Sequence, residues 1–211
     1  MTSLNTPLLK EGVFYVEVKD WNRRLFNSLI PLPQGTTYNA YLIKGTEKTA
    51  LIDTLNPGFK KELEGKINNV SSVNQIDYII MNHAEPDHAG AIPYLLTKND
   101  KAKLVCTKIG AKAAQTYFKV PEKRILIVKD NDTLELGNKT LKFIEAPMLH
   151  WPETIFTYLV QEKILFTCDF FGLHTAYGLY DEEVAELSTF AQRYFGEIMM
   201  PFRGCGLRAI E

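Results

Sequence analysis

The sequence predicts an α/β protein in which two mixed β-sheets pack against each other and helices cover their outer faces. Two blocks of short segments rich in β-branched and aromatic residues are each joined to segments with the apolar spacing of helices. Glycine and proline separate these segments. Because every sheet and helix must bury an apolar face, this order of elements favours packed layers.

Length and composition fit one large domain or two small ones, and a single domain over residues 1–211 is expected. The chain has 211 residues, and 45% of them are hydrophobic, which is enough to bury a sizeable core. The formal net charge of −1 provides no basic field, so neither nucleic acid nor an anionic membrane is an expected partner. No apolar run approaches the roughly 18 residues that a membrane span needs.

In the first block, strands and helices alternate. Strands are expected at residues 12–18, 38–43, 50–53, 76–81 and 103–107. Helices are expected over 59–70, from residue 90 through Leu96, and over 110–118. The run at 76–81 is continuously apolar, as is typical of a strand that is buried on both faces.

The second block consists mostly of strands. They are expected at residues 125–128, 133–139, 140–146, 155–160 and 164–168, with a Gly-Asn hairpin turn after the second of them. A long amphipathic helix is expected over 181–200, with three acidic residues at its positive end. Pro201 is expected to interrupt this helix.

Four potential metal ligands lie within six residues, directly after the buried strand at 76–81. They are His83, Glu85, Asp87 and His88, and Pro86 stiffens the loop between them. A loop at the end of a strand can direct alternate side chains into one cleft, although a solvated polar loop is the plainer alternative.

Two further candidates, His150 and Asp169, also follow strand-like runs. A carboxylate at the end of a buried strand needs a partner, because an isolated buried charge is costly. Three imidazoles and three carboxylates suit iron, manganese or zinc, whereas a structural zinc site more often uses cysteine. Asp169 is well placed to bridge two metal ions.

The loop motif resembles that of a known family. His-x-His-x-Asp-His is the metallo-β-lactamase pattern, and Glu85 in place of the second histidine resembles the flavodiiron proteins. Similar stretches at residues 37–43, 51–54, 149–158 and 164–172 extend this resemblance over nearly the whole chain. The resemblance implies a metallo-β-lactamase αββα sandwich over residues 1–211 that lacks the final elements and the flavodoxin-like domain.

The resemblance also implies which residues bind iron. His83, Glu85, His150 and Asp169 would hold one iron, while Asp87, His88 and the shared Asp169 would hold the second. The family has one more histidine ligand, on a loop beyond the C-terminal helix. The four histidines of the sequence are His83, His88, His150 and His174, so the second iron is expected to lack one protein ligand.

The activity implied by the family is the reduction of dioxygen to water, of nitric oxide to nitrous oxide, or of both. Electrons would come from FMN, supplied by another domain or chain, or from a rubredoxin-type donor. A head-to-tail homodimer is also implied, and Trp151 is a candidate for contact with the flavin. Two alternatives stay open: a zinc-dependent hydrolase, and a truncated module that binds metal without catalysis.

Three other features bear on function. His174 is a candidate catalytic residue beside the ligands, a packing residue, or a substitute for the missing ligand. Asp53 ends an apolar strand and is expected to support the metal loop by hydrogen bonds. The three cysteines, Cys106, Cys168 and Cys205, are too few and scattered for a disulfide framework, and no signal-peptide pattern is visible, so a cytoplasmic protein is expected.

Overall fold

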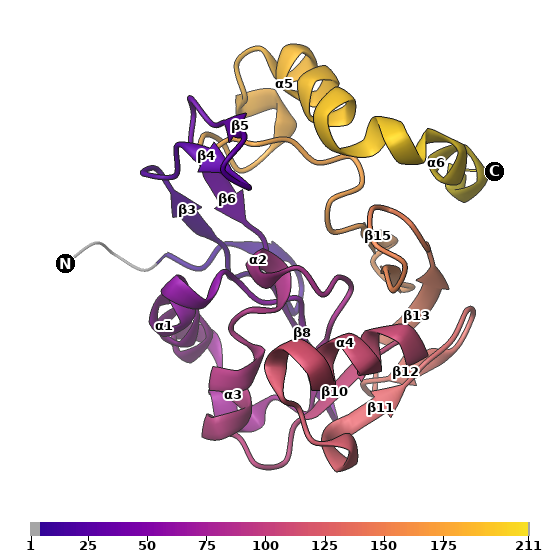
Figure 1. The fold of residues 1–211 in the computed structure, drawn as a ribbon. Coiled ribbons are helices and arrows are strands. Elements are labelled where there is room, and N and C mark those ends of the chain that lie inside the picture. Colours follow the sequence, from indigo (N-terminus) through magenta and orange to yellow (C-terminus); the bar gives the residue numbers. More distant parts are fainter. Residues whose placement is uncertain (1–4, 211) are drawn as a thin grey trace.

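The computed structural model describes residues 5–210, and two β-sheets form its centre (Figure 1). The larger sheet contains, in spatial order, β1 (Leu8–Lys10), β2 (Val13–Tyr15), β7 (Tyr41–Lys44), β8 (Thr49–Ile52), β9 (Tyr78–Ile80), β10 (Lys103–Cys106) and β11 (Ile125–Ile127). From β1 to β8 neighbouring strands run antiparallel, and from β8 to β11 they run parallel. Mixed pairing was predicted for both sheets and is found in this one, whereas the smaller sheet has only antiparallel pairs; the α/β fold class is confirmed.

The smaller sheet is antiparallel throughout. It contains β12 (Thr133–Glu135), β13 (Thr140–Glu145), β14 (Ile155–Leu159) and β15 (Ile164–Phe166). Two short hairpin-like pairs lie outside both sheets: β3 (Val18–Asp20) with β6 (Thr36–Tyr38), and β4 (Leu25–Phe26) with β5 (Ile30–Pro31).

Side chains that point alternately to the two faces of the larger sheet form two hydrophobic cores. Leu51, Ile79 and Leu104 face the helices α1 (Lys60–Val70), α3 (Ile92–Lys98) and α4 (Lys108–Phe118). Their neighbours Ile52 and Ile80 face the smaller sheet instead. Because side chains alternate between the two faces of a strand, a continuously apolar strand fills both cores at once.

The C-terminal region packs near one end of the smaller sheet. It comprises the turn Asp181–Glu183, α5 (Leu187–Tyr194), the π-helical segment Phe195–Met199, the 3-10 turn Met200–Phe202 and α6 (Arg203–Ile210). Tyr194 and Met199 pack with Leu149, Phe156 and Phe170 in a third, smaller core. Figure 1 shows α5 and α6 at the top of the molecule, away from the other helices.

One expectation for this region was wrong. The predicted helix over residues 181–200 begins at Leu187 instead, because Glu186 has a left-handed backbone that interrupts the helix. Pro201 interrupts the helical region as predicted, because the 3-10 turn Met200–Phe202 separates the π-helical segment from α6. Pro201 occupies the first turn of the 3-10 segment, where its missing N–H removes no helical hydrogen bond.

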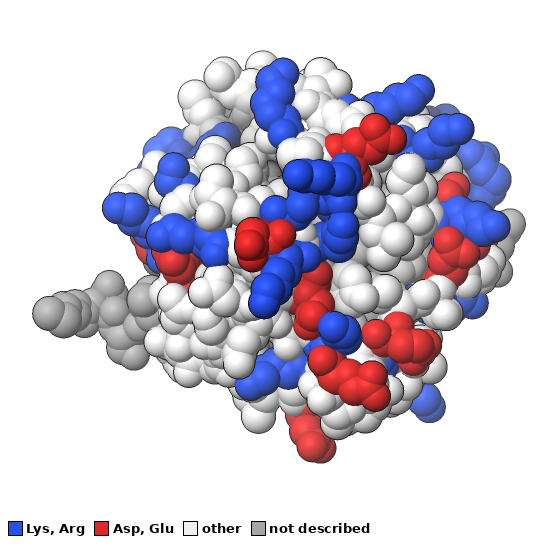
Figure 2. All heavy atoms as spheres, turned by 90° about the horizontal axis from the view of Figure 1, so that it is seen from below, with Lys and Arg blue, Asp and Glu red and all other residues white. Residues whose placement is uncertain are grey.

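On the face drawn in Figure 2, lysine and arginine side chains are interspersed with aspartate and glutamate, so no large field of one sign covers it. No helix within residues 5–210 has both the length and the apolar character needed to cross a membrane. The predicted domain extent, 1–211, includes residues 1–4 and 211, which lie outside the described residues.

Candidate metal centre

Residues 82–90 connect β9 to α3 and are fixed in place by a buried asparagine. The backbone N–H of Asn82 donates to Asp53 Oδ1 (2.8 Å), at the end of β8. The Asn82 side chain accepts from Thr157 Oγ1 (2.6 Å) and donates to the Phe166 carbonyl (3.2 Å), both in the smaller sheet. The loop is therefore attached to both sheets. Within it, Pro86 begins the short helix α2 (Pro86–Ala89), a position that proline favours.

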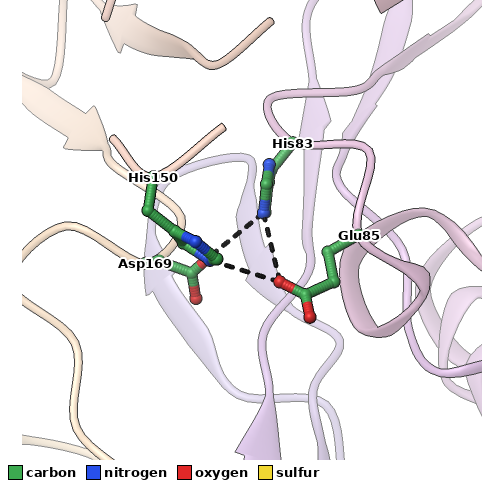
Figure 3. Close-up of side chains that lie close together, drawn as sticks. All are labelled: His83, Glu85, His150 and Asp169. Atoms are coloured by element: carbon green, nitrogen blue, oxygen red, sulfur yellow. Dashed lines mark ion pairs between the residues drawn. The ribbon is translucent and has the colours of Figure 1, made fainter. Parts of the chain in front are cut away.

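Four side chains from three loops converge at one point (Figure 3). His83 and Glu85 come from the loop after β9, His150 from the loop between β13 and β14, and Asp169 from the segment after β15. One donor atom from each side chain lies within 4.8 Å of all the others.

The separations between these donor atoms fit one shared cation. The Nε2 atoms of His83 and His150 lie 3.4 and 3.2 Å from Glu85 Oε2, and each lies 3.5 Å from Asp169 Oδ2. Donor atoms bound about 2.1 Å from a single metal ion would lie about 3–3.5 Å apart. His83 Nε2 and Asp169 Oδ2 are buried without a hydrogen bond, an arrangement that a bound cation would relieve.

Glu153 orients His83. The Nδ1 atom of His83 lies 2.9 Å from Glu153 Oε1, which also accepts the backbone N–H of Ala84 at 2.9 Å. Donation of the Nδ1 proton to this carboxylate leaves the Nε2 lone pair directed at the other donor atoms. A carboxylate behind a histidine is the usual support of a metal-binding imidazole.

Asp87 and His88 lie beside the four converging side chains rather than among them. His88 Nε2 is 3.1 Å from Asp169 Oδ1, on the side of that carboxylate opposite to the atom that faces His83. Asp87 Oδ1 is buried without a hydrogen-bond partner among the described residues. Both side chains line a cavity of about 60 Å³, named here the inner cavity, together with Asp169. The three residues thus border a second possible metal position.

The charges of the site depend on one another. Burial opposes ionisation of His150, but the nearby carboxylates of Asp169 and Glu85 outweigh it and raise the pKa of His150 to about 9. Burial likewise opposes the charged form of Glu85, while the nearby imidazoles of His150 and His83 lower its pKa to about 2. Without metal, protons on the histidines therefore balance the carboxylates.

His174 and Tyr194 form another wall of the inner cavity. His174 Nδ1 lies 3.1 Å from Thr36 Oγ1, its Nε2 atom is buried without a hydrogen bond, and its ring packs edge-on against Tyr194. Burial lowers the pKa of His174 to about 4, so the ring is neutral near pH 7. The Tyr194 hydroxyl donates to Asp169 Oδ1 at 2.9 Å.

Trp151 lies next to His83 and His150. Its ring packs edge-on against His83, with the ring centroids 5.0 Å apart. Trp151 and His150 both line an open groove of about 560 Å³ along α4, and Ile109, Tyr117 and Met148 supply apolar surface there.

Comparison with known proteins identifies the family to which this chain belongs. The family model described as "ODP family beta lactamase" matches residues 36–201. The chain belongs to this family.

Several named proteins similar to this ODP domain are flavodiiron proteins or related oxidoreductases. It is 38% identical to "Nitric oxide reductase" of Moorella thermoacetica over 92% of this chain and 49% of that protein. The flavodiiron protein from Giardia intestinalis has a TM-score of 0.92 at 32% identity, over 98% of this chain and 51% of the other. Rubredoxin oxygen:oxidoreductase from Desulfovibrio gigas has a TM-score of 0.93 at 34% identity, over 98% of this chain and 52% of the other. The ODP chain spans about half the length of these proteins, and the predicted flavodiiron resemblance is confirmed.

The ODP domain brings together most of the residues that the sequence indicated. Four of the six predicted ligands converge, and Asp87 and His88 border the adjacent inner cavity. The ligand role of all six stays a prediction, as do the roles of His174 and Trp151. Sequence reasoning missed Glu153 and Tyr194. Glu153 had a signal, a carboxylate three residues after His150, whereas Tyr194 had none besides its place on an amphipathic helix.

Proposed function

We propose that this chain binds a pair of iron ions and, with them, reduces dioxygen to water, nitric oxide to nitrous oxide, or both. The names of its relatives support both reactions, because one is a nitric oxide reductase and another a rubredoxin oxygen:oxidoreductase. FMN or a rubredoxin-type protein would supply the electrons.

One observation carries the proposal: a glutamate occupies the metal loop and converges with two histidines and an aspartate. Mixed imidazole and carboxylate donors suit non-haem iron, and anionic oxygen donors favour its ferric state. The three free cysteines contribute no donor to this group. The donor set therefore fits a redox-active iron centre better than a structural zinc site.

The donor positions suggest how the two ions would be shared. His83, Glu85, His150 and Asp169 would hold the first iron, and Asp87, His88 and the second oxygen of Asp169 would hold the other. When bound, such a pair supplies two electrons at one place and acts as a Lewis acid.

The surrounding residues have supporting roles in this proposal. Glu153 holds His83 in the tautomer that exposes Nε2, and the Tyr194 hydroxyl bonds to Asp169 Oδ1, opposite the oxygen that faces the first site. His174, neutral at physiological pH, keeps an unpaired ring nitrogen at the inner cavity. These groups fix donor orientations before any metal binds, which lowers the cost of assembling the site.

We propose that electrons arrive through the groove along α4. His150, a candidate ligand, forms part of its wall, and Trp151 links the groove to the ring of His83. A flavin held by another domain, or by the partner in a head-to-tail homodimer, could lie against this apolar surface. The free cysteines are consistent with a cytoplasmic location.

The test is gas consumption by iron-loaded protein with a reduced FMN flavoprotein as donor. We expect dioxygen or nitric oxide to be consumed, with nitrous oxide formed from the latter. Glu85→Gln removes one anionic donor and should abolish the reaction, while Glu122→Ala, on the exposed surface, should not. Failure of iron-loaded protein to consume either gas with any reductant would contradict the proposal.

A further inference from the structure

The donor atoms of the site adjoin two hollows that have no wall residue in common. The groove along α4 reaches His150, whereas the inner cavity reaches Asp87, His88 and Asp169. His150 lies between β13 and β14, whereas Asp87 and His88 belong to α2, so the two hollows reach the site past different segments of the chain.

The inner cavity adjoins a larger hollow, named here the vestibule. The vestibule has a volume of about 270 Å³, and its outer wall includes the exposed rings of Phe171, Tyr177 and Tyr180. The two hollows share five wall residues, which form what we call the neck: Thr37, Asn39, Cys168, Gly172 and Leu173. Shared walls mean that the vestibule adjoins the inner cavity directly.

Hydrogen bonds hold the walls of the neck in place. Thr37 Oγ1 donates to the Thr175 carbonyl at 2.7 Å, which ties β6 to the segment after Asp169. Asn39 Oδ1 accepts the hydroxyl proton of Tyr15, which also lines the vestibule. Because both bonds join segments that are distant in sequence, the neck is a feature of the folded chain.

Gly172 keeps one side of the neck clear of any side chain. Its N–H donates to the Asp169 carbonyl at 2.9 Å in a tight turn, and a Cβ atom at Gly172 would lie 2.8 Å from that same carbonyl oxygen. A larger residue would therefore both narrow the neck and displace the backbone of Asp169.

We infer that small ligands and water reach the Asp87 and His88 side of the site from the vestibule, through the neck, while electrons arrive separately at His150. This inference rests on the proposed function, whose reductions consume protons and release water. The inner cavity is the smaller of the two hollows, at about 60 Å³, and it has room for diatomic and triatomic ligands.

Azide, a linear triatomic anion, tests this route without turnover. Its association rate with iron-loaded protein is measured from the change in absorption on rapid mixing. Asn39 is exposed, so Asn39→Trp should fold and should obstruct the neck. We expect azide association to slow about tenfold, within the roughly one to three decades over which association rates vary among variants. Leu173→Ala widens the neck and should instead speed it.

Ala113→Trp is the matched control, because it adds the same side chain to the groove along α4. It should leave azide association unchanged and slow reduction by a flavoprotein donor. If both iron-loaded variants, Asn39→Trp and Leu173→Ala, bind azide at the wild-type rate, the route is overturned but the proposed function is not. Should Asn39→Trp not load iron, an unchanged rate in Leu173→Ala overturns the route by itself. Wild-type protein that binds no iron would overturn both.

Discussion

At the scale of single residues, Glu153 shows how a group outside the metal loop determines the chemistry within it. Its carboxylate is buried and accepts from both the His83 ring and the Ala84 backbone. Without it, the His83 imidazole would lose its fixed orientation and its preferred tautomer.

We therefore expect Glu153→Ala to weaken metal binding about 10- to 100-fold, the usual effect of losing such a support. Glu153→Gln keeps an acceptor oxygen and should bind with intermediate affinity. Competition with a chelator of known affinity measures the difference, with Glu122→Ala as the surface control. Equal affinity in wild type and Glu153→Ala would show that the contact does not support the site.

Protonation of His150 should make the stability of the metal-free protein depend on pH. Nearby carboxylates raise its folded pKa to about 9, above the ordinary value of about 6.5. The resulting stabilisation is fully present below about pH 6.5 and is lost as the pH rises through about 9. Urea midpoints of metal-free protein at these two pH values should differ more for wild type than for His150→Ala. An identical pH dependence in the two proteins would contradict this reading.

The sequence identified the six predicted ligands because they follow strand-like runs or share one short loop. Asp87 and His88 lie at the inner cavity rather than among the four converging side chains, and that difference depends on the backbone path of the loop. Tyr194 lies 25 residues from its partner Asp169, so no local pattern could have paired them. Glu153 lies 70 residues from His83, and its contact with the His83 ring can be recognised only in the folded structure, where the two sheets pack together.

At the scale of elements, the loop at residues 82–90 depends on Asn82 as its attachment to both sheets. The Asn82 side chain is completely buried and bonds to Thr157 and Phe166. Truncation would leave a buried hydroxyl and a buried carbonyl without partners.

Asn82→Ala should thus lower the free energy of unfolding by about 2–3 kcal/mol, as expected for buried polar groups left unpaired. Urea denaturation measures this change. Asn74→Ala removes the same side chain from an exposed turn and should have little effect. Similar losses in both variants would show that the buried contacts of Asn82 contribute nothing particular.

Strands were easier to predict than the C-terminal helices. The run at 76–81, which contains β9, was predictable because a strand whose side chains fill two cores is apolar at successive positions, and the sequence shows this directly. The start of α5 depends instead on the left-handed backbone of Glu186, which amphipathic spacing does not reveal. The small pairs β3–β6 and β4–β5 also went unpredicted, since strands of two or three residues carry too few positions for a pattern.

At the scale of the whole molecule, the site connects the two sheets. His83 and Glu85 follow a strand of the larger sheet, whereas His150 and Asp169 follow strands of the smaller one. A metal ion held by all four would join both halves, and a ligand that binds only the folded state stabilises all of it.

Metal removal should therefore lower the thermal midpoint of the whole domain. Free metal at about 1,000 times its dissociation constant adds roughly 4 kcal/mol to the free energy of unfolding. Calorimetry before and after chelation measures the shift, and Glu85→Gln should show a smaller one. A midpoint that does not change on chelation would mean that the four side chains bind no metal in the folded protein.

Iron content per chain, measured together with the optical spectrum of protein produced with iron, tests the diiron proposal most directly. We expect two irons per chain and a ferric absorption band that disappears on reduction. Two irons would establish that this chain holds a second ion besides the one at the four converging side chains. A single metal per chain, or zinc in place of iron, would contradict the diiron proposal.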